Sequence, residues 1–359
     1  MSAEETGREV GGRVLISLAA FVVIVAGMKA AAPLLVPFLL ALFITIVLAP
    51  VFDGLQRLGL PAGVALLAVI IALVLVVTLI GALMGNSLQD FLRAFPGYQA
   101  RLQETVAGLL QWLEGKGLEV STGTVRQYLD PGKAMVMVTG MLRGMGGLLT
   151  NGFLILITVI FLLLEASSFP DKWRVASGNA ESSLADFRAT ARKINHYMGI
   201  KTLTSLATGI IIAGWLFLLG VDYPLLWGML AFFLNFVPTI GSIIAAVPAV
   251  VLGLVQGGVS LALLVSAGYL AVNIGIGTFA EPRFMGRGLG LSTLVVFLSL
   301  VVWGWVLGPV GMLLSVPLTI AAKIVLEGHS GTRWLAVMLG PRVVTPAADG
   351  TNPATDPAV

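Results

Sequence analysis

Two apolar segments of this sequence carry polar and helix-breaking residues at their middle, and these residues are the strongest candidates for chemistry. Residues 224–255 include the string NFVPTIGSIIAAVPAV, and residues 291–325 include GWVLGPVGMLLSVPLTIA. Proline lacks a backbone donor and clashes with the preceding turn, so neither segment can be one straight helix. An interrupted backbone exposes polar groups that could bind a polar solute or an ion. The candidates are Asn235, Pro238, Thr239, Gly241, Ser242, Gly308, Pro309, Gly311, Ser315 and Pro317.

The two strings also resemble each other. Each has a proline followed closely by a glycine, then a short apolar stretch and a Val-Pro pair, Val247-Pro248 or Val316-Pro317. Corresponding Gly/Pro-interrupted segments in a membrane protein point to the binding site of a transporter. A kinked packing helix is the alternative for either segment alone, and the matched pair favours a functional role.

Four further polar residues lie within or beside apolar segments: Lys201, Thr202, Ser205 and Asn273. Hydroxyl and amide groups suit the recognition of a small uncharged solute, because they donate and accept hydrogen bonds without a fixed charge. The alternative is that they form hydrogen bonds between helices, worth about 1–2 kcal/mol at most.

Three charged residues, Glu281, Arg283 and Arg287, follow the segment that ends at Ala280. Ionisable residues near membrane depth are functional candidates by default. Our leading interpretation is an ion pair within this loop that sets the angle between neighbouring segments. The sharper hypothesis is that Glu281 is a gating or proton-coupling carboxylate.

Several functional classes are excluded by what the sequence lacks. It has no cysteine, no GxxxxGK[ST] string and no HExxH string, and its two histidines, His196 and His329, lie outside the apolar segments. We therefore expect no enzyme activity, no metal site and no cofactor. The basic residues form no stripe with interleaved aromatics, so we expect no nucleic-acid partner.

The composition indicates an all-α polytopic membrane protein. Hydrophobic residues make up 57% of the 359 residues and charged residues 11%, whereas soluble domains carry about 25% charge. A spanning helix needs about 20 apolar residues. Val14–Met28 could be read as a signal-peptide core, but the acidic residues before it favour a first membrane helix. About eight hydrophobic segments are expected, at 14–32, 34–48 (closed by Pro50), 62–84, 147–164, 203–219, 224–255, 259–280 and 291–325.

The polar regions between these segments define the expected organisation of the chain. Membrane segments 1–3 fill residues 1–85, and residues 86–145 form an extramembrane, periplasmic helical region. The fourth segment occupies 146–165, and 166–201 form a cytoplasmic amphipathic helix. Residues 202–327 contain segments 5–8 as a transport core, and the tail 328–359 is expected to be disordered.

The two broken segments are longer than a membrane span. At 1.5 Å per residue, 32 and 35 residues would reach about 48 and 52 Å. Both segments are therefore either bent spans or re-entrant hairpins. The dense basic residues of 166–201 place that region in the cytoplasm, which puts both termini inside and 86–145 outside. Arg283 and Arg287 then favour hairpins, because hairpins leave their loop on the cytoplasmic side.

Long strings between Tyr197 and Glu327 resemble the autoinducer-2 exporter family: YMGIKTLTSLATG, LLWGMLAFFLNFVPTIGSIIAAVPAV and EPRFMGRGLGLSTLVVFLSLVVWGWVLGPVGMLLSVPLTIAAKIVLE. The resemblance implies a bacterial inner-membrane exporter of autoinducer-2 or a similar small polar metabolite. It also implies a homo-oligomer, with a pentamer suggested, and an elevator-like motion within each protomer.

Two other functions stay open. Some members resemble Na⁺(Li⁺)/H⁺ antiporters, although the sequence disfavours this because no Asp, Glu or His lies in the middle of a predicted span. The third hypothesis is a non-transporting membrane scaffold that uses 86–145 as a docking surface. The expected partners under the transport hypothesis are a small polar solute, the lipid bilayer and further copies of the chain.

Overall fold

A computed structural model describes residues 3–115, 140, 151–176, 181–238, 240–285, 290–328 and 331–341. Every regular element within these ranges is a helix, which confirms the all-α prediction. The elements are α1 (Ala3–Ala30), α2 (Ala32–Arg57), α3 (Ala62–Gly115), α6 (Gly152–Ala176), α7 (Glu181–Leu218), α8 (Pro224–Leu234), α9 (Ile240–Val272), the π-helix η1 (Asn273–Ala280), α10 (Glu281–Met285), α11 (Thr293–Leu313), α12 (Ser315–Glu327) and α13 (Arg333–Met338).

Five helices are long and apolar enough to cross a membrane, within residues 32–57, 62–105, 194–218, 240–284 and 293–313. Shorter apolar helices cover 19–30, 152–166 and 224–234. Large apolar side chains such as Phe21, Ile71 and Phe161 are exposed on these helices. A lipid environment accounts for that exposure, so the chain is a polytopic helical membrane protein.

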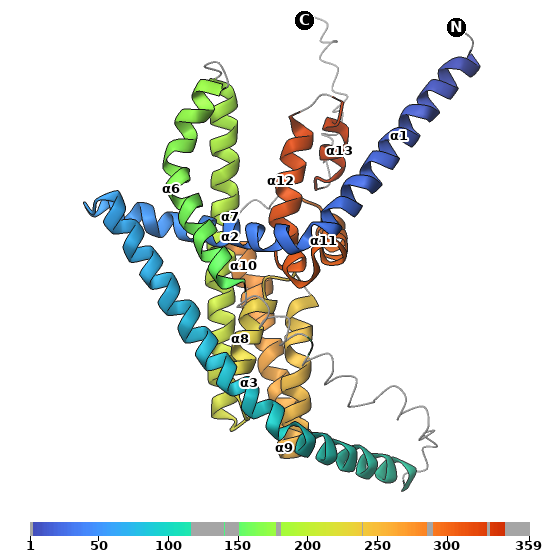
Figure 1. The fold of residues 1–359 in the computed structure, drawn as a ribbon. Helices are drawn as coiled ribbons and strands as arrows, with labels where there is room; N and C mark the ends of the chain where they lie inside the picture. Colours follow the sequence, from blue (N-terminus) through green and yellow to red (C-terminus); the bar gives the residue numbers. More distant parts are fainter. Residues whose placement is uncertain are drawn as a thin grey trace, which may run out of the picture.

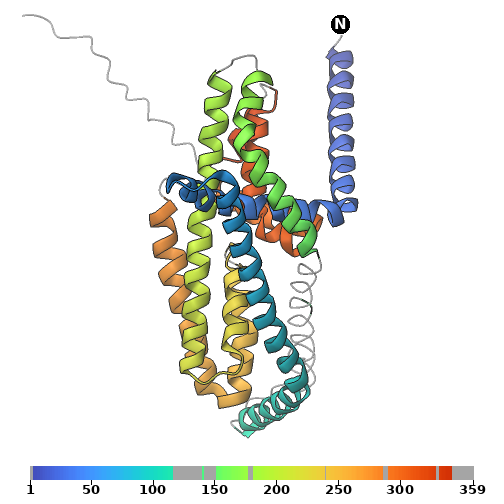
Figure 2. The same ribbon diagram turned by 60° about the vertical axis from the view of Figure 1, so that its left-hand side comes forward.

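The long helix α7 is the axis of the molecule (Figures 1 and 2). Its upper part runs beside α6, and its lower part runs beside α8 and α9. Helix α3 descends diagonally towards the turn of α9, whereas α2 crosses α7 at a steep angle (Figure 1). Helix α11 packs against α2, α12 stands beside the upper part of α7, and α1 projects away from the bundle (Figure 1).

Several helices continue past the ends predicted from the sequence. Helix α2 runs through Pro50 to Arg57, although we expected Pro50 to end it. Helix α3 continues from the third apolar segment to Gly115 and contains Pro96. A lost backbone bond at proline is tolerated when the rest of the helical ladder stays intact. Figure 1 shows α3 bending towards its C-terminal end, as proline-containing helices do. Most of the 116–145 part of the predicted periplasmic region lies outside the described residues.

The predicted connector 166–201 is not a separate helix. Its first part belongs to α6, which ends at Ala176, and its last part is the beginning of α7. Part of the C-terminal tail is also ordered, whereas we expected disorder from residue 328. Helix α13 buries Ala336, and the Leu339 carbonyl accepts a hydrogen bond from the Ser292 amide at 3.0 Å.

The first broken segment forms a helical hairpin. Helix α8 packs against the first arm of α9, and the described residues of the tip between them are 235–238. The chain then reverses at Gly258, where φ of 68° and ψ of −161° are accessible essentially only to glycine. The backbone amide of Asp222 donates to Gln256 Oε1 at 3.2 Å, so the hairpin starts and finishes at the same end of the molecule.

The second broken segment has the same architecture. The chain reverses inside α11 at Gly308, with φ of 69° and ψ of −152°. At the open end of this hairpin, Lys323 Nζ donates to the Gly290 carbonyl at 2.6 Å. A Cβ at Gly311 would overlap the Trp303 carbonyl, just as a Cβ at Gly241 would overlap the Leu234 carbonyl in the first hairpin. The predicted correspondence between the two strings is therefore present as two hairpins with a glycine beside each tip.

Candidate functional site

Helices α7 and α8 lie unusually close together because glycine faces glycine across their interface. A Cβ at Gly228 would sit 2.7 Å from the Gly209 carbonyl oxygen and 2.6 Å from Ala213 Cβ. A Cβ at Gly209 would meet the Gly228 carbonyl oxygen at 2.8 Å. Small residues at such contacts let helix backbones approach each other in membranes. The close contact brings the tip of the first hairpin against the middle of α7.

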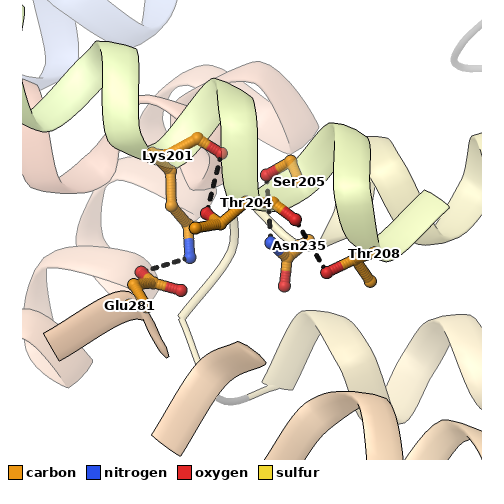
Figure 3. Close-up of polar contacts among 6 residues, drawn as sticks. All are labelled: Lys201, Thr204, Ser205, Thr208, Asn235 and Glu281. Carbon is orange, nitrogen blue, oxygen red and sulfur yellow. Dashed lines mark hydrogen bonds and ion pairs between the residues drawn. The ribbon is translucent and has the colours of Figure 1, made fainter. Parts of the chain in front are cut away.

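A hydrogen bond joins this tip to α7. Asn235, the residue after α8, donates from Nδ2 to Ser205 Oγ at 3.0 Å (Figure 3). Ser205 is fully buried, and Phe236 and Val237 beside Asn235 are also buried. An irregular backbone at membrane depth is tolerated where protein covers it. The structure therefore brings Asn235 and Ser205, both predicted site residues, together in one polar cluster.

A buried ion pair lies on the next turn of α7. Lys201 Nζ contacts Glu281 Oε1 at 2.7 Å, and their side chains are 6% and 16% exposed (Figure 3). Glu281 is the first residue of α10, directly after the π-helix η1. π-Helical turns are rare and occur frequently at functional sites. This pair is strongly desolvated and links two helices whose contacting residues are 80 positions apart.

Helix α7 carries further threonines near these positions in the sequence. Thr204 Oγ1 donates to the Lys201 carbonyl at 3.1 Å, and Thr208 Oγ1 donates to the Thr204 carbonyl at 2.9 Å (Figure 3). The Thr202 hydroxyl is buried and has no hydrogen-bond partner among the described residues. An unsatisfied buried hydroxyl costs stability, and Thr202 faces a different direction from Lys201 because successive residues of a helix do not share a face.

The tip satisfies most of its own backbone donors. The amides of Asn235 and Val237 donate to the carbonyls of Ala231 and Leu234, each at 2.9 Å. We expected freed backbone amides to act as ligands, and for these residues that expectation is wrong because tight turns replace the helical ladder. The groups left for a solute are side-chain groups and not these amides.

The second hairpin reaches α7 on the other side of the ion pair. Its buried Val316 packs with Tyr197 and Met198 of α7. Ser315 Oγ donates to the Met312 carbonyl at 2.9 Å, within its own hairpin. The predicted candidates Gly308, Pro309, Gly311, Ser315 and Pro317 therefore belong to a neighbouring hairpin, and the polar groups drawn in Figure 3 come from α7, the first tip and α10.

The remaining predicted candidates have different surroundings. Pro238 belongs to the first tip, and Gly241 and Ser242 follow on α9. The Asn273 side chain is exposed on η1, away from the buried cluster. Thr239 and Arg287 lie outside the described residues.

The prediction about the partner of Glu281 is wrong. We expected Glu281 to pair within its own loop, but it pairs with Lys201 of α7, and Arg283 is exposed. Glu281 lies near the C-terminal end of the apolar stretch 240–284, and its side chain is 16% exposed. Hydropathy placed the segment ends at these charges because it cannot detect a partner on another helix.

Sequence reasoning missed two groups near or below this site. Thr208 was not selected, although its spacing of four from Thr204 places both on one helical face. The network of Tyr98, Asp222 and Gln256 was also missed, and its long-range spacing gave no local signal. In the described ranges, no group of three or more histidine, aspartate or glutamate residues could hold a metal ion.

Comparison with known proteins extends over nearly the whole chain. The family described as "AI-2E family transporter" matches residues 18–330. The chain is 41% identical to the AI-2 transport protein TqsA of Escherichia coli, over 92% of this chain and 96% of that protein. It is 40% identical to the putative transport protein YhhT of E. coli, with 92% and 95% covered. A putative transport protein of Haemophilus influenzae is 38% identical, with 91% and 96% covered.

Proposed function

Because this chain belongs to the AI-2E family of transporters, we propose that it is a secondary transporter that exports autoinducer-2 or a similar small polar metabolite across the bacterial inner membrane. The observation that carries the proposal is the polar cluster at the first hairpin tip, where Asn235 meets Ser205 beside the buried pair Lys201–Glu281. The name of TqsA supports the choice of solute.

The chemistry of the cluster suits an uncharged solute. Lys201 and Glu281 cancel each other's charge, and the other groups, on Ser205 and Asn235, are neutral. A solute with a net charge would be left uncompensated in this desolvated region. A hydroxyl-rich neutral molecule can instead exchange hydrogen bonds with both ions and with the side chains of Ser205 and Asn235.

We further propose that both hairpins re-enter the membrane, each from its own side. Within each hairpin, the first and last residues lie close together. Figure 1 shows α12 and α13 towards the side of the molecule opposite to the turn of α9, so the two hairpins open towards opposite sides. One side of the molecule holds the start of α1, the C-terminus of α6, the N-terminus of α7, and α13 (Figure 1). The C-terminus of α3 lies at the opposite side. Because the basic residues of 166–201 place the α6–α7 end in the cytoplasm, both termini would then be cytoplasmic. Movement of the α7–α10 block would carry the cluster between the two sides, in a homo-oligomer.

Uptake into vesicles tests this proposal. We expect inverted vesicles containing the purified protein to accumulate labelled autoinducer-2, and Asn235→Ala and Ser205→Ala to slow that accumulation. Exposed Leu263 lies on the outer face of α9, so Leu263→Ala is the matched control and should keep the normal rate. Equal accumulation in empty vesicles and in vesicles with protein would contradict the proposal for this solute.

The Lys201–Glu281 pair supports a second candidate, a Na⁺(Li⁺)/H⁺ antiporter. A buried carboxylate whose charge depends on a partner can exchange a proton for a cation. This function predicts a cation-dependent pH change in inverted vesicles that Glu281→Gln abolishes. A pH change that depends on autoinducer-2 and not on sodium or lithium would favour solute export instead.

A further inference from the structure

Three elements meet in a polar network at the end of the molecule where the first hairpin opens. Tyr98 of α3 donates from its hydroxyl to Asp222 Oδ2 at 2.6 Å. Gln256, just before the turn of α9, donates from Nε2 to the same Asp222 oxygen and accepts the Asp222 amide at 3.2 Å. Trp227 Nε1 of α8 donates to the Asp222 carbonyl at 3.0 Å. Asp222 thus ties the α7–α8 loop to α8, α9 and α3.

The contacts of Asp222 fall into two classes. The bonds to Gln256 and Trp227 stay within the block formed by α7–α10. The bond to Tyr98 crosses from that block to α3. Around this crossing bond, Phe91 of α3 is buried and stacks edge-on against Trp227, with ring centroids 5.3 Å apart. Met84 of α3 belongs to the same apolar cluster.

The apolar contacts between α3 and the block respond to sliding differently from the Tyr98–Asp222 hydrogen bond. Apolar burial is non-directional, so α3 could shift against the block while keeping much of its buried area. A hydrogen bond requires a short distance and a narrow range of angles, so it favours one register. Asp222 is exposed and keeps its bonds to Gln256 when Tyr98 leaves, so water can replace the lost donor. The crossing bond can therefore break and re-form at a modest cost.

We propose that the Tyr98–Asp222 hydrogen bond is a latch that holds the α7–α10 block in one position against α3 and opens in each transport cycle. This inference rests on the proposed function, because a latch needs a moving block. The strained backbone of Tyr223, the neighbour of Asp222, has φ of 57° and lies in the left-handed region. Such strain in a non-glycine residue is found frequently at sites that switch.

Reversible cross-linking tests the latch directly, because the chain has no native cysteine. We expect a short bis-methanethiosulfonate reagent, which forms a reducible disulfide with each of two thiols and releases methanesulfinate, to join Tyr98→Cys to Asp222→Cys and to stop transport, and we expect transport to return after reduction. The matched control shares the Asp222→Cys change and places its partner within the block, at Gln256→Cys. The cross-linked Asp222→Cys/Gln256→Cys variant should transport at the same rate as this variant after reduction. Normal transport through the cross-linked 98–222 pair would overturn the proposal.

A second measurement does not depend on the solute. Met84→Cys places a thiol in the buried interface between α3 and the block. We expect Tyr98→Phe to raise its maleimide labelling rate about two- to tenfold, the factor that corresponds to losing one hydrogen bond. An unchanged rate would overturn the latch even if transport is confirmed. If the wild-type protein moves no tested solute, the proposed function fails, and this labelling rate alone decides whether the latch exists.

Discussion

Lys201 and Glu281 lie 2.7 Å apart in the interior of the protein, although 80 positions separate them in the sequence. Each charge is buried mainly because the other is present. Removing one partner leaves an uncompensated charge, whereas removing both leaves an apolar contact. This relationship makes the ion pair the most sensitive point of the candidate site.

The first prediction concerns this pair. Glu281→Gln or Lys201→Met should each lower the free energy of unfolding by about 3–5 kcal/mol, because one buried charge is left unpaired. The double variant Lys201→Met/Glu281→Leu should be more stable than either single variant. Thermal unfolding in detergent measures all three. Single variants as stable as the wild-type protein would show that water reaches the pair and compensates the remaining charge.

The hydrogen bond between Ser205 and Asn235 gives the second prediction. Ser205→Ala and Asn235→Ala should each reduce stability by about 0.5–1.5 kcal/mol, and their effects should not add, because each removes the same bond. In vesicles, the solute concentration for half-maximal transport should rise in both variants. A double variant whose loss equals the sum of the two single losses would mean that the side chains act independently.

The sequence was most informative where the cause of a feature is local. Gly241 and Gly311 stand beside breaks that proline and glycine dictate within a few residues, so both breaks and their resemblance were predictable, whereas the choice between bent spans and hairpins was left open. Ser205 and Asn235 were selected for their polarity in apolar surroundings, and the structure joins them.

Long-range relationships were not predictable in the same way. The partner of Glu281 lies on α7, and hydropathy ended both apolar segments at the charged residues. The continuation of α3 past residue 84 was also missed, because the polar residues from 86 onward end the apolar segment but not the helix. Asp222 gave no signal, since its partners Tyr98 and Gln256 come from elements far apart in the sequence.

The glycines at the two tips give the third prediction. Gly241→Ala and Gly311→Ala each place a Cβ against a backbone carbonyl that cannot rotate away, so each should destabilise the protein by about 1–3 kcal/mol or more. Gly214→Ala is the control, because nothing lies within 4 Å of its Cβ position on α7. Alanine is the better helix former, so the control should be as stable as the wild-type protein or more stable by up to about 1 kcal/mol. Thermal unfolding in detergent measures the stability of the three variants. Equal stability of all three would contradict the hairpin geometry.

The fourth prediction compares one chemical change at two tyrosines. Tyr269 on α9 is buried, and its hydroxyl has no hydrogen-bond partner among the described residues, whereas the Tyr98 hydroxyl donates to Asp222. Burying an unsatisfied hydroxyl costs about 1–3 kcal/mol, so Tyr269→Phe should leave stability unchanged or raise it. Tyr98→Phe removes a formed bond and should lower stability by about 0.5–1.5 kcal/mol. Denaturant unfolding of both variants under identical conditions measures the difference. A loss of stability in Tyr269→Phe would mean that an ordered water or a bound solute satisfies this hydroxyl inside the α7–α10 block. Transport by the same variant would then separate the two explanations. Only a solute contact would also change the solute concentration for half-maximal transport.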